Sequence, residues 1–130
     1  MKRLLLAGLA ICAVAGSSQT QAHHSVNGVY NVEKSAMISG VITEVEWVNP
    51  HIHFDMMVRD EKTKKDALWR FECVPVGVAR RAGLSKESLM SGGKPVQVRF
   101  NPSRNGDLTG YANELMMADG RRILFNGSRQ

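Results

Sequence analysis

The sequence predicts a mainly β fold, a small barrel with one short helix. Apolar and polar side chains alternate every two residues in several short segments, which is the period of a half-buried strand. The one clear helical segment follows the third of these strands. Removing a 22-residue leader from the 130 residues leaves 108, enough for one domain with a modest core. Because a closed barrel has no free strand edges, it suits a chain of this size.

Residues 1–22 have the pattern of a cleaved export signal. Met1-Lys2-Arg3 is positively charged, an apolar run extends from Leu4 to Val14, and Thr20-Gln21-Ala22 offers small residues where signal peptidase reads them. The apolar run is too short to span a membrane. We therefore expect cleavage after Ala22, a periplasmic or secreted protein, and no transmembrane anchor after cleavage. A cut after Ser17 is the alternative.

The processed chain is mildly basic and has one cysteine. Lys2 and Arg3 leave with the signal, so the formal charge becomes 15 − 12 = +3, which is too weak a bias to imply nucleic acid. Cys73 is the cysteine that remains, which excludes an intramolecular disulfide. We expect its thiol to be a small buried apolar group rather than a reactive one.

Three strands are expected in the first half of the domain. Residues 23–35 show no clear period and are interpreted as an N-terminal arm that leads into a single domain, residues 36–130. The first strand alternates, with Val41, Thr43, Val45 and Trp47 on one face and Ile42, Glu44, Glu46 and Val48 on the other. Pro50 ends it, because proline cannot donate to a ladder.

The second and third strands are predicted to form an antiparallel hairpin around a charged turn at residues 60–66. Their core faces are Ile52, Phe54, Met56 and Val58 on the second strand and Ala67, Trp69, Phe71 and Cys73 on the third. One register places Asp55 opposite Arg70 and His53 opposite Glu72. A slip of two residues would keep the faces and change the partners.

The second half of the domain adds a helix and two further strands. Residues 75–82 are expected to be a short helix capped by Gly83, and residues 85–90 a further helical turn with Ser85 as N-cap. A fourth strand follows at residues 96–100, then a turn-rich loop at 101–110 and a fifth strand at 111–117. Asp119-Gly120 signals a hairpin after which residues 123–125 pair back. The order β-β-β-α-β-β suits an OB-like barrel.

Five segments carry a family resemblance. They are Ala22-His23-His24-Ser25, Glu46-Trp47-Val48-Asn49-Pro50-His51, Ala79-Arg80-Arg81-Ala82-Gly83, Asn101-Pro102-Ser103-Arg104-Asn105-Gly106 and Asp119-Gly120-Arg121. Together they resemble the small exported bacterial proteins grouped as domain of unknown function 6152. The resemblance covers essentially the whole processed chain. It implies the compartment and fold more than a function, because the family has no established activity. His23, His24 and His51 match its histidine positions, whereas His53 departs from its pattern.

The histidines predict a metal site, with copper favoured and zinc second. Cleavage after Ala22 would give His23 a free α-amine beside its ring, and His51 or His53 could add a third nitrogen. In a second mode the amine combines with the amide nitrogen and ring of His24. Asp55 and Glu72 are candidates for further ligands or for carboxylates that orient a ring. The structural alternatives are a frayed tail and histidines that only satisfy local hydrogen bonds.

Two further functions compete with a metal site. A non-metal binding module for a cell-envelope ligand or a partner protein would use charged contacts on the barrel, for which the candidates are Arg70, Arg80, Arg81, Arg99 and Arg104. Nucleic acid is not expected, because the aromatic residues fall mostly on core faces. The other competing function is an enzyme, which ranks last because no motif specifies a reaction, and no catalytic residues are predicted. Met56, Met57, Met116 and Met117 could bind Cu(I), but we expect them mainly to fill the core.

Overall fold

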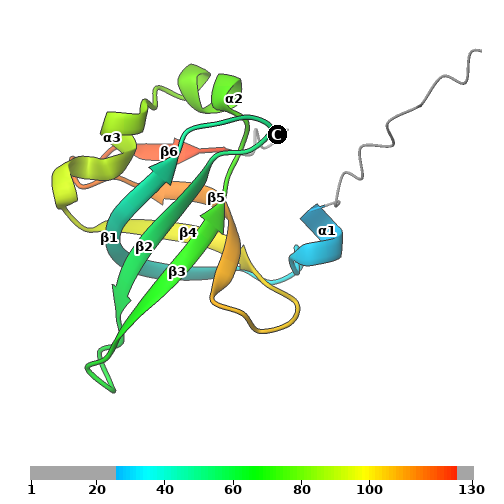
Figure 1. The fold of residues 1–130 in the computed structure, drawn as a ribbon, viewed down its shortest axis with the longest axis vertical. Coiled ribbons are helices and arrows are strands. Elements are labelled where there is room, and N and C mark those ends of the chain that lie inside the picture. The colour runs from blue at the N-terminus through cyan, green and yellow to red at the C-terminus, as the bar shows by residue number, and fades with distance from the viewer. Residues whose placement is uncertain (1–25, 126–130) are drawn as a thin grey trace, which may run out of the picture.

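The computed structural model describes residues 26–125 and shows one β-sheet closed into a barrel. The strands are β1 (Ala36–Glu46), β2 (His53–Arg59), β3 (Asp66–Glu72), β4 (Val96–Pro102), β5 (Thr109–Met116) and β6 (Arg122–Leu124). The helices are α1 (Val26–Val29), α2 (Val76–Arg81), α3 (Lys86–Met90) and the 3₁₀ turn η1 (Ser91–Gly93). Figure 1 shows α2 and α3 together at one end of the barrel and α1 at its side.

The barrel closes in the order of an OB fold. The sheet runs β3-β2-β1-β4-β5-β6, and β3 also pairs with β5 in parallel, which closes a ring of β1 to β5. Strand β1 makes closure possible because its residues Ala36–Gly40 pair with β4 and its residues Val41–Glu46 pair with β2. The predicted OB-like barrel, with its helix after the third strand, is confirmed, and β6 pairs back onto β5 as expected.

The core consists of the inward faces of the barrel strands and the helices that cover one end. The inward side chains of β2 to β5 include Phe54, Met56, Phe71, Val98, Phe100 and Leu115, all at most 1% exposed. Ala79 of α2 and Leu89 of α3 are also fully buried and belong to the same core. The predicted N-cap of α3 is present, since Ser85 and Ser88 exchange side-chain to backbone hydrogen bonds.

Two details differ from the predicted pattern. A β-bulge lies between Ile42 and Glu44, so Ile42 and Val45 are both buried instead of lying on opposite faces. The expected loop at 101–110 is shorter, because β4 continues to Pro102 and β5 begins at Thr109. Strict alternation fails at the bulge because the extra residue rotates the rest of β1 by one position.

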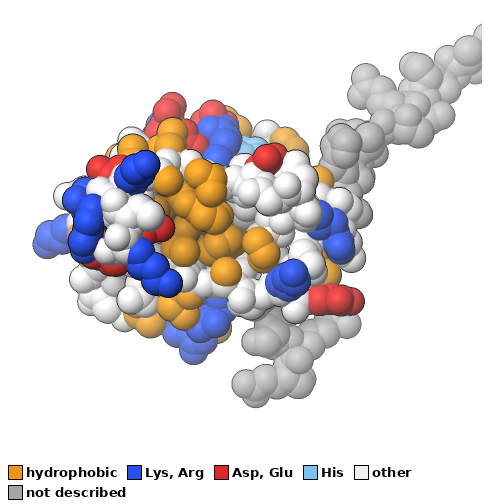
Figure 2. Space-filling model, turned by 90° about the horizontal axis from the view of Figure 1, so that it is seen from below, with side chains coloured by type: hydrophobic (Ala, Val, Ile, Leu, Met, Phe, Trp, Pro, Cys, Tyr) orange, Lys and Arg blue, Asp and Glu red, His pale blue; other side chains and the backbone are white. Residues whose placement is uncertain are grey.

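The outer face of the barrel carries an apolar row. The pairing registers place Val41 beside Met57 and Met57 beside Leu68. The side chain of Val41 is half-exposed, and those of Met57 and Leu68 are exposed. The face seen in Figure 2 shows hydrophobic side chains in a continuous band with charged side chains around it. The predicted core faces of β2 and β3 are nevertheless correct, because Met57 and Leu68 are not among the residues predicted for them and Met56 and Phe71 are buried.

Candidate metal-binding site

His51 is held by Glu72. It follows the cis Asn49–Pro50 peptide at the corner between β1 and β2, and Glu72 ends β3. Nδ1 of His51 makes a short contact with Oε1 of Glu72, and the two side chains are 29% and 21% exposed. Because an ionised carboxylate only accepts hydrogen bonds, Nδ1 must carry the proton. The lone pair of the neutral ring is then on Nε2.

Tyr30 holds the other oxygen of the same carboxylate. Its hydroxyl donates to Oε2 of Glu72 over 2.9 Å, and the side chain is buried at 6% exposure. Burial, reinforced by the hydrogen bond to Glu72, raises the pKa of Tyr30 above its ordinary value. Tyr30 follows α1 directly and pairs with Ser103 in an isolated bridge, so the segment before β1 is attached to the barrel beside His51.

Tyr111 completes the group. Its Cα lies opposite that of Glu72 in the parallel β3–β5 pair. Its ring is edge-on to the ring of His51, with centroids 6.4 Å apart, and lies 5.9 Å from the ring of Tyr30. Burial raises the pKa of Tyr111. We call Tyr30, His51, Glu72 and Tyr111 the histidine–tyrosine cluster.

The predicted register of β2 and β3 is correct, but one side-chain partner differs. Asp55 pairs with Arg70 and His53 lies opposite Glu72 along the backbone. The carboxylate of Glu72 nevertheless contacts His51, and Nδ1 of His53 is 3.9 Å from Glu46. The register is therefore confirmed, while the side chain of Glu72 meets His51 because the corner before β2 brings His51 to the end of β3.

Arg70 links the carboxylates beside this cluster. It is 2.7 Å from Glu46 and 3.0 Å from Asp55. The hydrogen bond from Arg70 lowers the pKa of Glu46. The carboxylate of Asp55 is therefore paired with Arg70 rather than with His51 or His53.

The described part of the chain does not contain a complete metal site. Within residues 26–125 no three His, Cys, Asp or Glu side chains are grouped closely enough to hold a metal ion. The predicted ligands His23 and His24, like the signal at 1–22, lie outside the described residues. His51 offers one nitrogen with a preset tautomer, and further ligands would have to come from elsewhere.

The five predicted contact arginines are spread over four segments. Arg70 is on β3, Arg80 and Arg81 are on α2, Arg99 is on β4 and Arg104 is in the β4–β5 loop. Three of them are already bonded within the fold: Arg70 as above, Arg99 to Glu114 over 3.2 Å, and Arg104 to the carbonyl of Asn27 over 2.8 Å.

The sulfur-containing residues follow the core interpretation in part. Met56 and Met117 are buried, at 0% and 3% exposure, whereas Met57 and Met116 have outward positions. Cys73 is 1% exposed, and burial raises its pKa to about 12. The thiol is therefore a poor candidate for a metal ligand.

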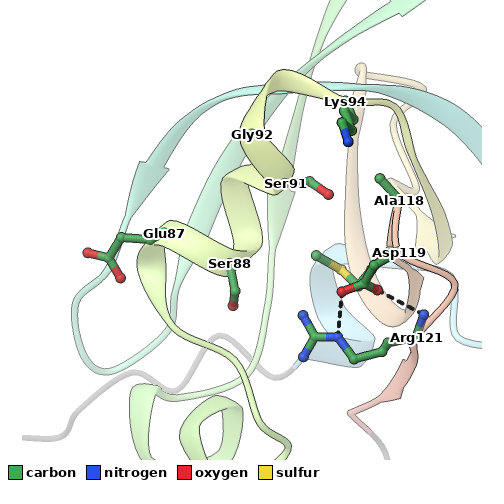
Figure 3. Close-up of a pocket in the computed structure, with 9 residues that line it drawn as sticks. Glu87, Ser88, Ser91, Gly92, Lys94, Ala118, Asp119 and Arg121 are labelled. Carbon is green, nitrogen blue, oxygen red and sulfur yellow. Dashed lines mark hydrogen bonds and ion pairs between the residues drawn. The ribbon is translucent and has the colours of Figure 1, made fainter.

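A separate polar groove of about 270 Å³ lies between α3–η1 and the turn before β6 (Figure 3). Arg121 is paired with Asp119 over 2.7 Å at its wall, while the side chain of Glu87 points away from the groove. None of the sequence-predicted site residues lines it.

Tyr30 and Tyr111 were missed by sequence reasoning. Tyr30 was part of an arm without a period, and Tyr111 was an ordinary strand residue. The available signal for Tyr30 was that it is a lone tyrosine in the arm at residues 23–35. No local signal identifies Tyr111, because its relation to His51 depends on the closure of the barrel.

A family model described as a family of unknown function, DUF6152, matches residues 10–113. The chain belongs to this family. The resemblance stated from the sequence is thus confirmed, and this member of the family folds as a small β-barrel. No curated protein matches the chain. A solved structure, the mitochondrial single-stranded DNA binding protein Rim1 from S. cerevisiae, is similar at 10% identity and a TM-score of 0.46, covering 63% of this chain and 90% of that one. Among the described residues of this family member, no helix is long and apolar enough to cross a membrane.

Proposed function

We propose that this chain is an exported protein that binds a copper ion through the N-terminal histidine of the processed chain and His51. The observation that carries the proposal is the bond between Nδ1 of His51 and Glu72. Histidine ligands of metals commonly donate their second ring N–H to a carboxylate, which fixes the tautomer and the ring orientation. His51 has this arrangement and leaves Nε2 as a lone-pair donor.

The length of the arm supports the second ligand. Six residues lie between His23 and Tyr30, and four of them form α1. At about 1.5 Å per helical step and about 3.5 Å per extended step, the chain from Tyr30 to His23 can span roughly 17 Å. Tyr30 shares the carboxylate of Glu72 with His51, so this span begins beside His51.

The donor set favours copper over zinc. An α-amine, the ring of His23 and Nε2 of His51 are three nitrogen donors, and tetragonal nitrogen coordination suits Cu(II). The mode through the amide and ring of His24 makes the same prediction. The position of His51 between β1 and β2 also agrees with a ligand site, since OB barrels bind ligands beside the β1–β2 and β4–β5 loops.

The test is native mass spectrometry of the exported, processed protein with and without one equivalent of Cu(II). We expect a chain that starts at His23 and retains one copper ion. His51→Gln should lower the affinity by about tenfold or more, as should adding one residue before His23. His53→Gln is the matched control and should have a much smaller effect.

Each result separates two models. Unchanged affinity after the N-terminal extension would exclude the form that uses the amine. No retained copper in the unmodified protein would overturn the metal proposal and leave the non-metal envelope module. In that case substitution of the histidines would leave partner recovery intact, and the arginines would be the residues to test.

A further inference from the structure

We infer that Tyr30 is a positioning residue that fixes the tautomer of His51 and couples it to docking of the N-terminal arm. The hydroxyl of Tyr30 and the imidazole of His51 occupy the two different oxygens of the Glu72 carboxylate. A carboxylate held at both oxygens has little freedom to rotate away from either partner. The part of this inference that concerns copper rests on the proposed function, and the part that concerns the tautomer does not.

The position of Tyr30 depends on the arm. Its backbone N–H donates to the carbonyl of Val26 in α1 over 2.8 Å, and the next residue, Asn31, donates to the carbonyl of Pro102 over 2.9 Å. Tyr30 also pairs with Ser103. These contacts attach the arm to the end of β4 and the loop that follows, and they place the hydroxyl at Glu72. Undocking the arm would remove the Tyr30 hydroxyl from the carboxylate.

The hydrogen bond from the Tyr30 hydroxyl to Glu72 matters for the position of this carboxylate because Tyr30 is buried. Tyr30 is 6% exposed, so loss of this bond cannot be replaced fully by water without opening the arm. Coupling between two events is reciprocal. If docking of the arm favours the Nδ1–H form of His51, a ligand that requires a free Nε2 must in turn favour docking of the arm.

Tyr111 provides the matched control. It lies in the same cluster and contacts both Tyr30 and His51 through its ring, whereas the bond to Glu72 comes from Tyr30. Both Tyr→Phe substitutions remove one oxygen from a half-buried to buried ring. Only Tyr30→Phe removes a hydrogen bond to the carboxylate that holds His51.

The first test is ¹⁵N NMR of the histidine side chains in the metal-free protein, at a pH at which imidazoles are neutral. In the unmodified protein and in Tyr111→Phe we expect the ring shifts of His51 to report Nδ1–H almost alone. In Tyr30→Phe we expect a mixture of both tautomers. Tyr30→Phe shifts equal to those of the unmodified protein would overturn the inference.

A second variant keeps the inference testable if Tyr30→Phe fails to fold. Glu72→Gln retains an acceptor for Tyr30 while its amide can present N–H to His51. We expect the Nε2–H tautomer to gain population. An unchanged Nδ1–H signal in Glu72→Gln would contradict a role for this carboxylate and for Tyr30 behind it.

The second test adds Cu(II) alone and measures affinity and hydrogen exchange. We expect Tyr30→Phe to lose about three- to tenfold in affinity, less than loss of an orienting carboxylate costs. Copper should slow amide exchange in residues 26–35 of the unmodified protein, and should slow it less in Tyr30→Phe. Equal protection in both proteins would refute the coupling. If the unmodified protein retains no copper, the proposed function fails, and the NMR result still decides the tautomer.

Discussion

Gly40 lies against the main-chain carbonyl of Met57, so closely that a Cβ at position 40 would overlap this oxygen. Gly40 is also where β1 changes its pairing partner from β4 to β2. At this point β1 and β2 approach each other without a side chain between them. The neighbouring atom is backbone and cannot rotate away.

Gly40→Ala is therefore expected to destabilise the fold by about 2 kcal/mol, since overpacking next to backbone forces the strands apart. The midpoint of urea unfolding measures the change. Gly77→Ala is the matched control, because its Cβ would meet only the end of the Arg81 side chain at 3.5 Å. In helix α2 that change should be neutral or stabilise by about 0.5 kcal/mol. A Gly40→Ala protein as stable as Gly77→Ala would contradict the close approach.

Asn49 caps α2 from a distant part of the chain. Its Oδ1 accepts a hydrogen bond from the backbone N–H of Val76 over 3.2 Å, where the N-cap residue Pro75 offers no side-chain acceptor. Asn49→Ala should cost about 1 kcal/mol of unfolding free energy, as expected for loss of a cap. Asn49→Asp retains the acceptor and should cost little. Equal losses in the two variants, measured by thermal unfolding, would argue against capping.

Glu114 gives the fold an acid-sensitive ion pair. Its carboxylate is 11% exposed and contacts Arg122 at 2.6 Å and Arg99 at 3.2 Å. The bond from Arg122, with a further contribution from Arg99, lowers the pKa of Glu114 below its ordinary value of 4.5. Because the folded state binds the proton less readily than the unfolded state, this contribution is fully present above pH 4.5 and is lost as the pH falls through the folded pKa.

Glu114→Gln should remove part of the acid dependence. We expect a loss of about 1 kcal/mol at neutral pH, modest because both arginines remain solvated. The loss should shrink as the pH is lowered below 4.5. Glu44→Gln, an exposed change on β1, serves as control. Parallel stability-versus-pH curves for the unmodified protein and Glu114→Gln would refute this assignment.

Cys73 should be unreactive in the folded protein. Burial raises its pKa to about 12 and leaves the side chain 1% exposed, so the thiolate is scarce and inaccessible. We expect no labelling of the processed protein by a thiol reagent at pH 8 over the time in which the urea-unfolded chain reacts completely. Rapid labelling of the folded protein would show that the region around Cys73 opens readily.

Much of the fold could be predicted from the sequence. The strand segments, the inward faces of β2 and β3 and the N-cap Ser85 all follow from local patterns, and the structure agrees with them. A strand has a side-chain period of two and a helix begins at a capping residue, so neighbouring residues suffice for such predictions. The bulge after Ile42 could not be predicted, because an extra unpaired residue is visible only against the partner strand.

The histidine–tyrosine cluster also combines features that follow from local sequence with contacts that only the folded chain creates. The sequence by itself determined that His51 lies at a strand corner and that Glu72 lies on the polar face of β3. The tertiary structure alone decided that Glu72 holds His51 rather than His53 and that Tyr30 shares its carboxylate. Tyr30 and Glu72 are 42 residues apart, and Glu72 meets Tyr111 through the parallel pairing that closes the barrel. Such contacts depend on where the closed sheet places its ends, and this information is absent from any local stretch of the chain.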